Sequence, residues 1–158
     1  MAGAAERFER AAEAAGIPVQ IRRYPEGTRT AQDAALAVGC QIGQIVKSLV
    51  FVADGTAFLA LTSGANRADP KRLAGFLGAR EVRRANADEA REATGFAIGG
   101  TPPFGHPQPI QVFVDRDLLG FELLWAAGGT PDSVFPIRPE DLIRAAGGIV
   151  EDFREEAG

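Results

Sequence analysis

The amino-acid sequence predicts a single α+β domain, built from a mixed, curled and partly barrel-like β-sheet with helices at its flanks. The chain has 158 residues, of which 46% are hydrophobic, so one core of ordinary size can form. Helix and strand patterns are mixed along the chain rather than strictly alternating, which favours α+β over a regular βα repeat. No linker, low-complexity tract or internal repeat interrupts residues 1–158, so we expect one domain over this length.

In the first half of the chain, boundary residues mark each expected element. Gly16 ends a segment with alanine and phenylalanine at helical spacing, and Thr30 is a suitable N-cap for a second helix. Asp54 and Gly55 form the strongest hairpin signal in the sequence, because this dipeptide suits the two-residue turn between paired strands. The expected elements are a helix over 4–15, a strand over 19–24, a helix from Thr30 to about 38, and strands over 46–53 and 56–62.

In the second half, prolines and capping residues indicate three more helices. Asp69 and Pro70 start the first of them, since proline suits the first position of a helix. Asn86 caps the next, which ends at Gly95, and Pro139 opens the last. A β-like segment over 96–98 leads into a glycine–proline loop, strands are expected over 110–114, 122–126 and 134–137, and the last helix runs to about 146.

The composition limits the compartment and the cofactors. No apolar run approaches the length that crosses a bilayer, and the charged, alanine-rich N-terminus lacks the apolar centre of a signal peptide. Cys40 is the only cysteine, so no disulfide forms within the chain, in agreement with the reducing cytoplasm where we expect the protein. One histidine and one cysteine do not make a zinc site of the usual kind. We therefore expect no metal, no other cofactor and no membrane partner.

The charge of the chain is unevenly distributed. Its net charge of −4 argues against a protein that coats nucleic acid non-specifically. Residues 1–84 nevertheless hold 12 Lys+Arg and 8 Asp+Glu, whereas residues 85–158 hold 5 and 13. Ordinary solvated surface explains this difference, and a basic face that contacts a few phosphates is the alternative. The candidates for such a face are Arg22, Arg23, Arg29, Arg67, Lys71 and Arg72.

Lys47 is one of only two lysines, beside 15 arginines, and it interrupts the apolar run IVKSLVFVA. This strand is apolar on both faces, and burial of an unpaired ammonium costs several kcal/mol. One interpretation is a lysine near the strand end whose ammonium reaches solvent. We favour the other, in which the ammonium faces a pocket and binds an anion or a polarised carbonyl.

A glycine–proline loop is the second candidate for a functional site. Three glycines and three prolines fall within nine residues, GGTPPFGHP, which start at Gly99. Exposed backbone N–H groups at Gly99, Gly100 and Thr101 can hold an oxyanion or a carboxylate, as ester hydrolysis requires. A rigid connection between strands is the alternative. A second glycine turn, at Gly128 and Gly129, either lines the same cavity or simply turns the chain.

The sequence offers no conventional nucleophile. His106 is the only histidine, so a catalytic triad would have to include it, and no G-x-S-x-G motif accompanies it. Cys40 follows a helix end and has no visible activating partner. His106 therefore either contacts a substrate or stiffens its loop.

Three segments resemble the YbaK/ProX superfamily of aminoacyl-tRNA deacylases, which includes the editing domain inserted in bacterial prolyl-tRNA synthetases. They are TRTAQDAALAVGCQIGQIVKSLVF, GFAIGGTPPFGHP and LLWAAGGTPDSVFPIRPEDLI. The similarity extends from about residue 8 to 149, with the segments in the order of the family. It implies the YbaK-type fold of a prolyl-tRNA synthetase editing domain and the activity of an aminoacyl-tRNA hydrolase that serves translation fidelity.

The resemblance also implies roles for residues. Lys47 matches the lysine that binds the aminoacylated 3′ end of the tRNA, and Gly99 to Pro103 match the loop whose backbone holds the terminal adenosine and the aminoacyl group. In this superfamily water, or the thiol of a cysteine cargo, attacks the ester, and the terminal ribose hydroxyl can assist. Further candidates for substrate contacts are Thr30, Ser48, Pro102, Pro103, His106, Gly128 and Gly129, and those for tRNA phosphates are Arg22, Arg23, Arg67 and Arg72.

Ser48 separates this chain from one branch of the superfamily. Alanine-specific deacylases usually carry asparagine directly after the lysine, where Ser48 stands here. The cargo therefore stays open among alanine, serine, threonine, cysteine and 2-aminobutyrate, attached to proline tRNA.

We accordingly expect a trans-editing enzyme that acts on mischarged proline tRNA, with prolyl-tRNA synthetase as a candidate partner. A non-catalytic module that binds aminoacyl-tRNA or a nucleotide is the alternative, although the presence of both Lys47 and the intact loop favours the enzyme. A DNA-binding regulator is disfavoured, because the net charge is negative and no helix-turn-helix pattern is visible. The oligomeric state stays open.

Overall fold

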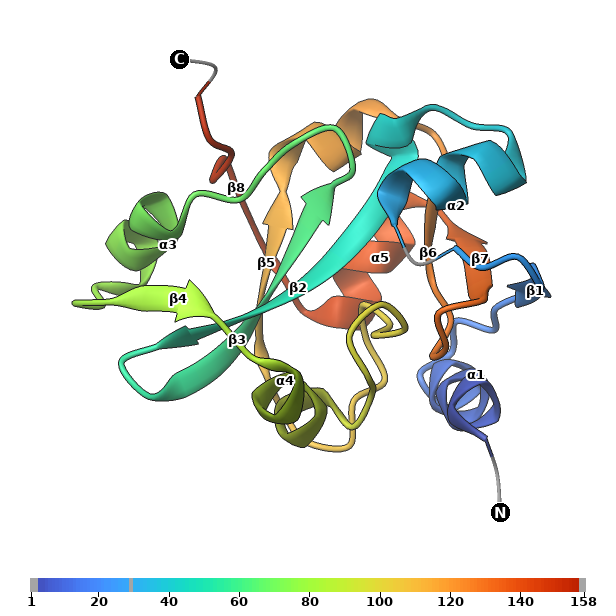
Figure 1. The fold of residues 1–158 in the computed structure, drawn as a ribbon, viewed down its shortest axis with the longest axis horizontal. Helices are drawn as coiled ribbons and strands as arrows, with labels where there is room; N and C mark the ends of the chain where they lie inside the picture. The colour runs from blue at the N-terminus through green and yellow to red at the C-terminus, as the bar shows by residue number, and fades with distance from the viewer. Residues whose placement is uncertain (1–2, 29, 157–158) are drawn as a thin grey trace.

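One twisted β-sheet runs through the protein and carries helices on both sides (Figure 1). The computed structural model describes residues 3–28 and 30–156 of the chain. The strands are β1 (Arg22–Arg23), β2 (Ile45–Ala53), β3 (Thr56–Ser63), β4 (Val82–Arg84), β5 (Gln111–Asp115), β6 (Leu124–Ala127), β7 (Ser133–Ile137) and β8 (Ile149–Glu151). Their order is β1-β7-β6-β2-β3-β5-β8, with β4 paired to β2. The sheet contains parallel pairs (β2 with β6, β3 with β5, β5 with β8) as well as antiparallel ones, so the predicted mixed α+β sheet is confirmed.

The helices begin and end close to where the sequence places them. They are α1 (Ala4–Ala14), α2 (Ala31–Val38), α3 (Pro70–Leu77), α4 (Ala87–Thr94) and α5 (Pro139–Ala146), with 3₁₀ turns η1 (Ile42–Gln44) and η2 (Arg116–Gly120). The Thr30 hydroxyl accepts from the backbone N–H of Asp33 at 3.0 Å, which confirms it as the cap of α2. Asn86 and Glu89 form a reciprocal capping box at the start of α4.

The β2–β3 hairpin forms the centre of the sheet. Asp54 and Gly55 both have positive φ angles, +48° and +88°, as a two-residue hairpin turn of the primed type requires. Ala53 pairs with Thr56 across this turn, and the register continues to the pair of Val46 and Ser63. The predicted hairpin is therefore confirmed, and its tight turn fixes which β2 side chains share a face.

Two faces of β2 contribute to different parts of the core. Val46 and Val50 belong to the main cluster, which also holds Phe8 of α1 and Leu142 of α5. Phe51, on the other face, packs in a second cluster with side chains of β3, β5 and α3. Ser48 lies between Val46 and Val50 in the alternation of the strand, so its side chain points to the main cluster.

The outer edge of β2 is interrupted. Ile45 and Val46 pair with β6, and residues 51–53 pair with β4, but no strand in the described part of the chain pairs with this edge between the two. Ala85 donates its N–H to the carbonyl of Val50 at 3.0 Å, so the backbone polar groups of Val50 face this edge. Because such groups alternate along a strand, those of Ser48 face it too.

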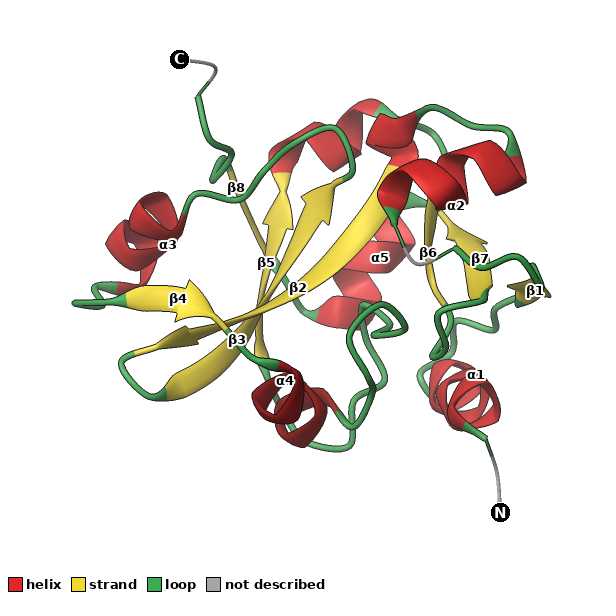
Figure 2. Cartoon of the chain, in the orientation of Figure 1, coloured by secondary structure: helices red, strands yellow, loops and turns green. Residues whose placement is uncertain are grey.

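The differences from the sequence prediction concern short strands. The strand predicted over 19–24 is limited to Arg22 and Arg23, and the β-like segment 96–98 lies in a loop. Figure 2 shows the segment between α4 and β5 as a long loop without helix or strand. β4 and β8, three residues each, were not predicted, because three residues are too few to show an alternating pattern. No helix among residues 3–28 and 30–156 is long and apolar enough to span a membrane.

Candidate functional site

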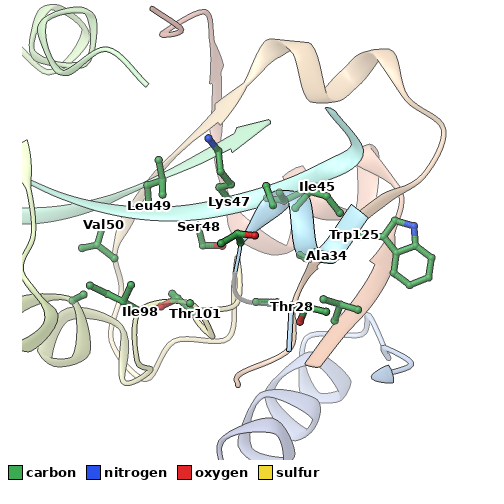
Figure 3. Close-up of a pocket in the computed structure, with 18 of the residues that line it drawn as sticks. Thr28, Ala34, Ile45, Lys47, Ser48, Leu49, Val50, Ile98, Thr101 and Trp125 are labelled. Atoms are coloured by element: carbon green, nitrogen blue, oxygen red, sulfur yellow. The ribbon is translucent and has the colours of Figure 1, made fainter. Parts of the chain in front are cut away.

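A cavity of about 350 Å³ opens at the interrupted edge of β2 (Figure 3). Residues 45–50 of β2 form one wall, and the rest of the lining includes residues of α2, β4, α4, β6, β7 and the loop that contains Gly99 and Thr101. Six alanines line the cavity: Ala31, Ala34, Ala85, Ala90, Ala126 and Ala127. Their small side chains leave space that larger apolar residues would fill.

Lys47 and Ser48 are adjacent in this wall, but their side chains point in opposite directions. In Figure 3 Ser48 points toward Thr101, together with Val50, whereas the ammonium of Lys47 points away from them. This follows from the alternation of a β-strand. Lys47 is therefore part of the wall of the cavity, but its ammonium does not face the hydroxyl of Ser48.

The ammonium of Lys47 is held by the turn that follows β3. Its Nζ donates to the backbone carbonyl of Asn66 at 2.5 Å, and the Asn66 amide donates to Asp115 at 2.9 Å and to Asp117 at 2.8 Å. Burial is the main reason why the pKa of Lys47 lies below its usual value, and the positive charges of Arg84 and Arg67 lower this pKa further, against an opposing effect of Asp115. This electropositive setting suits contact with an anion.

The glycine–proline loop presents only part of its predicted site to the cavity. Gly99, with a φ of +89°, and Thr101 line the cavity. Their N–H groups have no hydrogen-bond acceptor among the described residues, so they are available to a ligand. Gly100 does not line the cavity, and its N–H already donates to the carbonyl of Ala97 at 3.0 Å. The structure therefore corrects the expectation that Gly100 offers a free donor.

Gly100 has a different task, which is close packing. A Cβ atom at this position would lie 2.7 Å from the Cα of Thr130, in the turn that contains Gly128 and Gly129. The absence of a side chain thus lets the two loops touch. Gly128 donates its N–H to the carbonyl of Ser133 at 3.0 Å, and neither Gly128 nor Gly129 is part of the cavity wall. Of the two alternatives for this turn, the structure supports the one in which it only turns the chain.

His106 stiffens the loop from within. Its Nε2 lies 2.8 Å from the carbonyl of Pro102, so Nε2 carries the proton and donates it. Burial lowers the pKa of His106, while this hydrogen bond opposes the change. Pro102 and Pro103 are buried, and none of these three residues belongs to the cavity wall. Thr30 and Ser48, in contrast, do line the cavity.

The arginines that were predicted to contact phosphates do not gather on one face. β1 carries Arg22 and Arg23, and Figure 1 places it at the opposite end of the molecule from α3, which carries Arg72. Arg23 pairs with Glu6 and Asp132, Arg67 lies 3.9 Å from Glu155, and Arg72 pairs with Asp152. Arg22 lies over the ring of Trp125, and this tryptophan lines the cavity. Arg29 lies outside the described residues.

The lining residues that the sequence interpretation missed include Thr28, Arg84 and Trp125. Arg84 lines the cavity from β4 and lies over the ring of Phe51 at 5.5 Å. Its charge lowers the pKa of Lys47, so the two cations act on the same region. No signal could have found Arg84, because β4 is too short to be recognised. Among the described residues no three His, Cys, Asp or Glu side chains come together as metal ligands would.

The fold and the cavity together fit an editing hydrolase: cations border a small cavity, and its described wall has no His, Cys, Asp or Glu side chain that could form a catalytic triad with a hydroxyl. The chain belongs to the aminoacyl-tRNA editing domain family, whose model matches residues 25–145. It is accordingly an aminoacyl-tRNA deacylase, and the resemblance of its sequence to that superfamily is confirmed.

Three relatives show how far the similarity extends. A solved structure described as a candidate trans-editing enzyme for prolyl-tRNA synthetase is 44% identical, covers 99% of both chains and superposes with a TM-score of 0.93. The protein YwhH of Bacillus subtilis is 28% identical over 77% of this chain and 78% of its own length. The proline–tRNA ligase of Citrifermentans bemidjiense is 34% identical over 60% of this chain, but this match spans only 16% of the ligase.

Proposed function

We propose that this protein hydrolyses, in trans, the ester bond of proline tRNA that carries a small non-cognate amino acid. The observation that carries the proposal is the cavity at the interrupted edge of β2, where Ser48 and Thr101 face the interior and Lys47 and Arg84 border it. The interior suits a small aminoacyl group, and the cations suit the phosphate of the terminal nucleotide.

Proline tRNA is favoured as the substrate by two similarities. The structural relative with 44% identity is described as acting with prolyl-tRNA synthetase, and the ligases that share this domain attach proline. Neither similarity names the amino acid that is removed. The cargo class is therefore inferred from the cavity itself, whose alanine-rich wall favours side chains of the size of alanine, serine, cysteine, 2-aminobutyrate or threonine.

The chemistry that fits this wall is attack by water. A water molecule adds to the ester carbonyl, the bond from the carbonyl carbon to the ribose oxygen breaks, and the ribose oxygen takes up a proton. The products are the free amino acid and the tRNA with its terminal hydroxyl restored. The N–H groups of Gly99 and Thr101 would stabilise the negative charge that develops on the carbonyl oxygen.

The cations would act in binding rather than in proton transfer. The ammonium of Lys47 lies on the far side of β2 from Ser48, and only one of its three N–H donors is engaged, with the carbonyl of Asn66, so the others can contact an anion. Lys47 and Arg84 would therefore orient the 3′ end, which lowers the barrier by holding the ester against the loop.

The test is a panel of proline tRNAs charged with labelled alanine, serine, threonine, cysteine, 2-aminobutyrate or proline. We expect release of at least one small non-cognate amino acid well above the spontaneous rate, and no such acceleration for proline. Spontaneous hydrolysis without protein and the same panel on a different tRNA serve as controls. Binding of all charged tRNAs without accelerated release would support the alternative, a non-catalytic aminoacyl-tRNA or nucleotide-binding module.

A further inference from the structure

Ser48 carries an unsatisfied polar atom in the wall of the cavity. Its Oγ is buried and has no hydrogen-bond partner among the described residues. The other buried hydroxyls of the wall differ in this respect. Thr28 donates to the carbonyl of Pro131 at 3.1 Å, and Thr101 donates to the carbonyl of Ala97 at 3.0 Å. Because a buried hydroxyl without a partner is costly, this exception points to a partner that arrives with the ligand.

The position of Ser48 limits what that partner can be. Its side chain lies between those of Val46 and Val50, which are 4% and 5% exposed, and it points toward the buried Thr101. Arg84, Thr30 and Ile98 form the exposed part of the same wall. A charged 3′ end that contacts Lys47 and Arg84 would thus insert its smallest part, the amino-acid side chain, toward Ser48.

We propose that Ser48 selects cargo that carries a hydroxyl group, so that the preferred substrates are seryl and threonyl esters. A cargo hydroxyl can both donate to Ser48 Oγ and accept from it, and the neighbouring Thr28 and Thr101 keep only lone pairs for further contacts. A methyl group at the same place would leave Ser48 unpaired. This inference rests on the proposed function, since it names the class of cargo for that same cavity.

The size of the preference follows from the cost of an unpaired hydroxyl. Sites that hydrogen-bond a substrate hydroxyl reject the analogue that lacks it, because the polar group of the site is then left without a partner. For one neutral hydrogen bond we expect a preference of roughly ten- to a hundredfold in kcat/KM. Alanine is a weaker comparison, because it differs from serine in size as well as in polarity.

The experiment compares two pairs of cargo that differ only by a hydroxyl in place of a methyl group, serine with 2-aminobutyrate and threonine with valine, on the same proline tRNA. In the wild-type protein the hydroxyl member of each pair should be released faster. Ser48→Ala should reduce both ratios to about one, because the methyl side chain no longer distinguishes the two cargoes. Thr62→Val is the matched control, since it also removes a buried hydroxyl, but one that is not part of the cavity wall and donates to the carbonyl of Ala60. Its ratios should stay close to those of the wild type.

Each outcome has a distinct meaning. Equal rates within both pairs for the wild type, or ratios that survive Ser48→Ala, would overturn the inference while the deacylase itself stands. If Ser48→Ala slows all cargoes alike, and this effect disappears on tRNA that ends in 2′-deoxyadenosine, Ser48 binds the ribose hydroxyl and the inference is wrong. If no cargo of the panel is released at all, it is the proposed function that fails.

Discussion

Lys47 and Ser48 lie on opposite faces of β2 although they are neighbours in the chain. The side chain of Ser48 points into the cavity and that of Lys47 to the opposite face, where the ammonium donates to Asn66 and the positive charges of Arg84 and Arg67 lower its pKa. The lysine is thereby suited to an anion of the tRNA and the serine to the cargo. Variants at the two positions should consequently change different kinetic constants.

Lys47→Ala should fold normally and lose most of its deacylase activity. A charge-assisted contact contributes more than a neutral one, so we expect a fall of roughly ten- to a hundredfold in kcat/KM, mainly through KM. Single-turnover deacylation over a range of enzyme concentrations measures this effect, and a thermal melt checks the fold. Lys47→Arg should recover only part of the activity, since the planar guanidinium has a different shape. Equal turnover by Lys47→Ala and the wild type would contradict the role.

His106 should make the protein sensitive to mild acid. Burial lowers the pKa of the folded-state imidazole below 6.5, so the unfolded chain binds the proton more readily. Stability is therefore fully present above about pH 6.5 and is lost as the pH falls below it. Urea denaturation at pH 7.5 and 5.5 measures this loss, and His106→Gln, which keeps a donor for Pro102, should show less of it. Because His106 is the only histidine, an equal loss in both proteins would contradict this account.

The sequence predicted those site residues that a local pattern reveals, and it missed those that only long-range pairing brings to the cavity. Lys47, Ser48, Gly99 and Thr101 stand out in a strand or a loop that the sequence itself delimits, and all four line the cavity. Arg84 enters the site only because β4 pairs with β2, which a local pattern does not reveal. Pro102, Pro103 and His106 lie in the same loop as Thr101, yet none of them lines the cavity. The loop is irregular, so the directions of neighbouring side chains cannot be read from the sequence as they can in a strand.

At the scale of the elements, the loop that starts at Gly99 packs against the turn that contains Gly128 and Gly129, and this contact supports the cavity wall at Thr101. Gly100 allows the loop of residues 99–105 to lie directly against the turn at Thr130, without a side chain between them. The position of Thr101 in the cavity depends on this contact. A substitution here should therefore act on the fold of the protein before it acts on chemistry.

Gly100→Ala should lower the free energy of unfolding by about 1–3 kcal/mol, the usual cost of overpacking. The added Cβ would lie 2.7 Å from the Cα and 2.8 Å from the carbonyl carbon of Thr130, and backbone atoms cannot rotate away. Urea denaturation measures the change. Gly75→Ala is the matched control, because its Cβ meets nothing within 4 Å and alanine favours the helix α3. If both variants are as stable as the wild type, the two loops do not touch in this way.

The elements that the sequence predicted well are those with local signals. Thr30, Asn86 and the Asp54–Gly55 turn fix their helices and hairpin through contacts within a few residues. β4 and β8 exist only through their partners, Phe51 to Ala53 for β4 and Phe113 to Asp115 for β8. The order of the strands likewise depends on long-range pairing, which no local pattern contains.

For the molecule as a whole, the arrangement of charge favours a small footprint on the tRNA. The net charge is −4, and Arg23, Arg67 and Arg72 are near carboxylates. Lys47 and Arg84 both line the cavity, and neither forms an ion pair with a carboxylate among the described residues. Few phosphates can be neutralised at once, so the dependence of binding on salt should be shallow.

Arg84→Glu should weaken binding of aminoacyl-tRNA and reduce the slope of log K against log salt by about one. Arg83→Glu is a close control, because it makes the same charge change at the preceding residue of β4, where the wild-type arginine pairs with Glu89 at 2.7 Å. Its effect on the salt slope should be much smaller. Fluorescence anisotropy of labelled tRNA at several salt concentrations measures both. The same slope for both variants would mean that net charge, and not the position of Arg84, determines binding.

The interrupted edge of β2 has a consequence for how such a domain can diversify. One continuous strand supplies the constant wall, while β6 and β4 border the opening from distant parts of the sequence and have no direct pairing with each other. A mutation that shifts either border can widen or narrow the opening, or change its polarity, without altering the pairing of β2 with β3. Descendants of one ancestral domain could thus acquire new substrate preferences through changes on either border, while β2 and β3 stay the same.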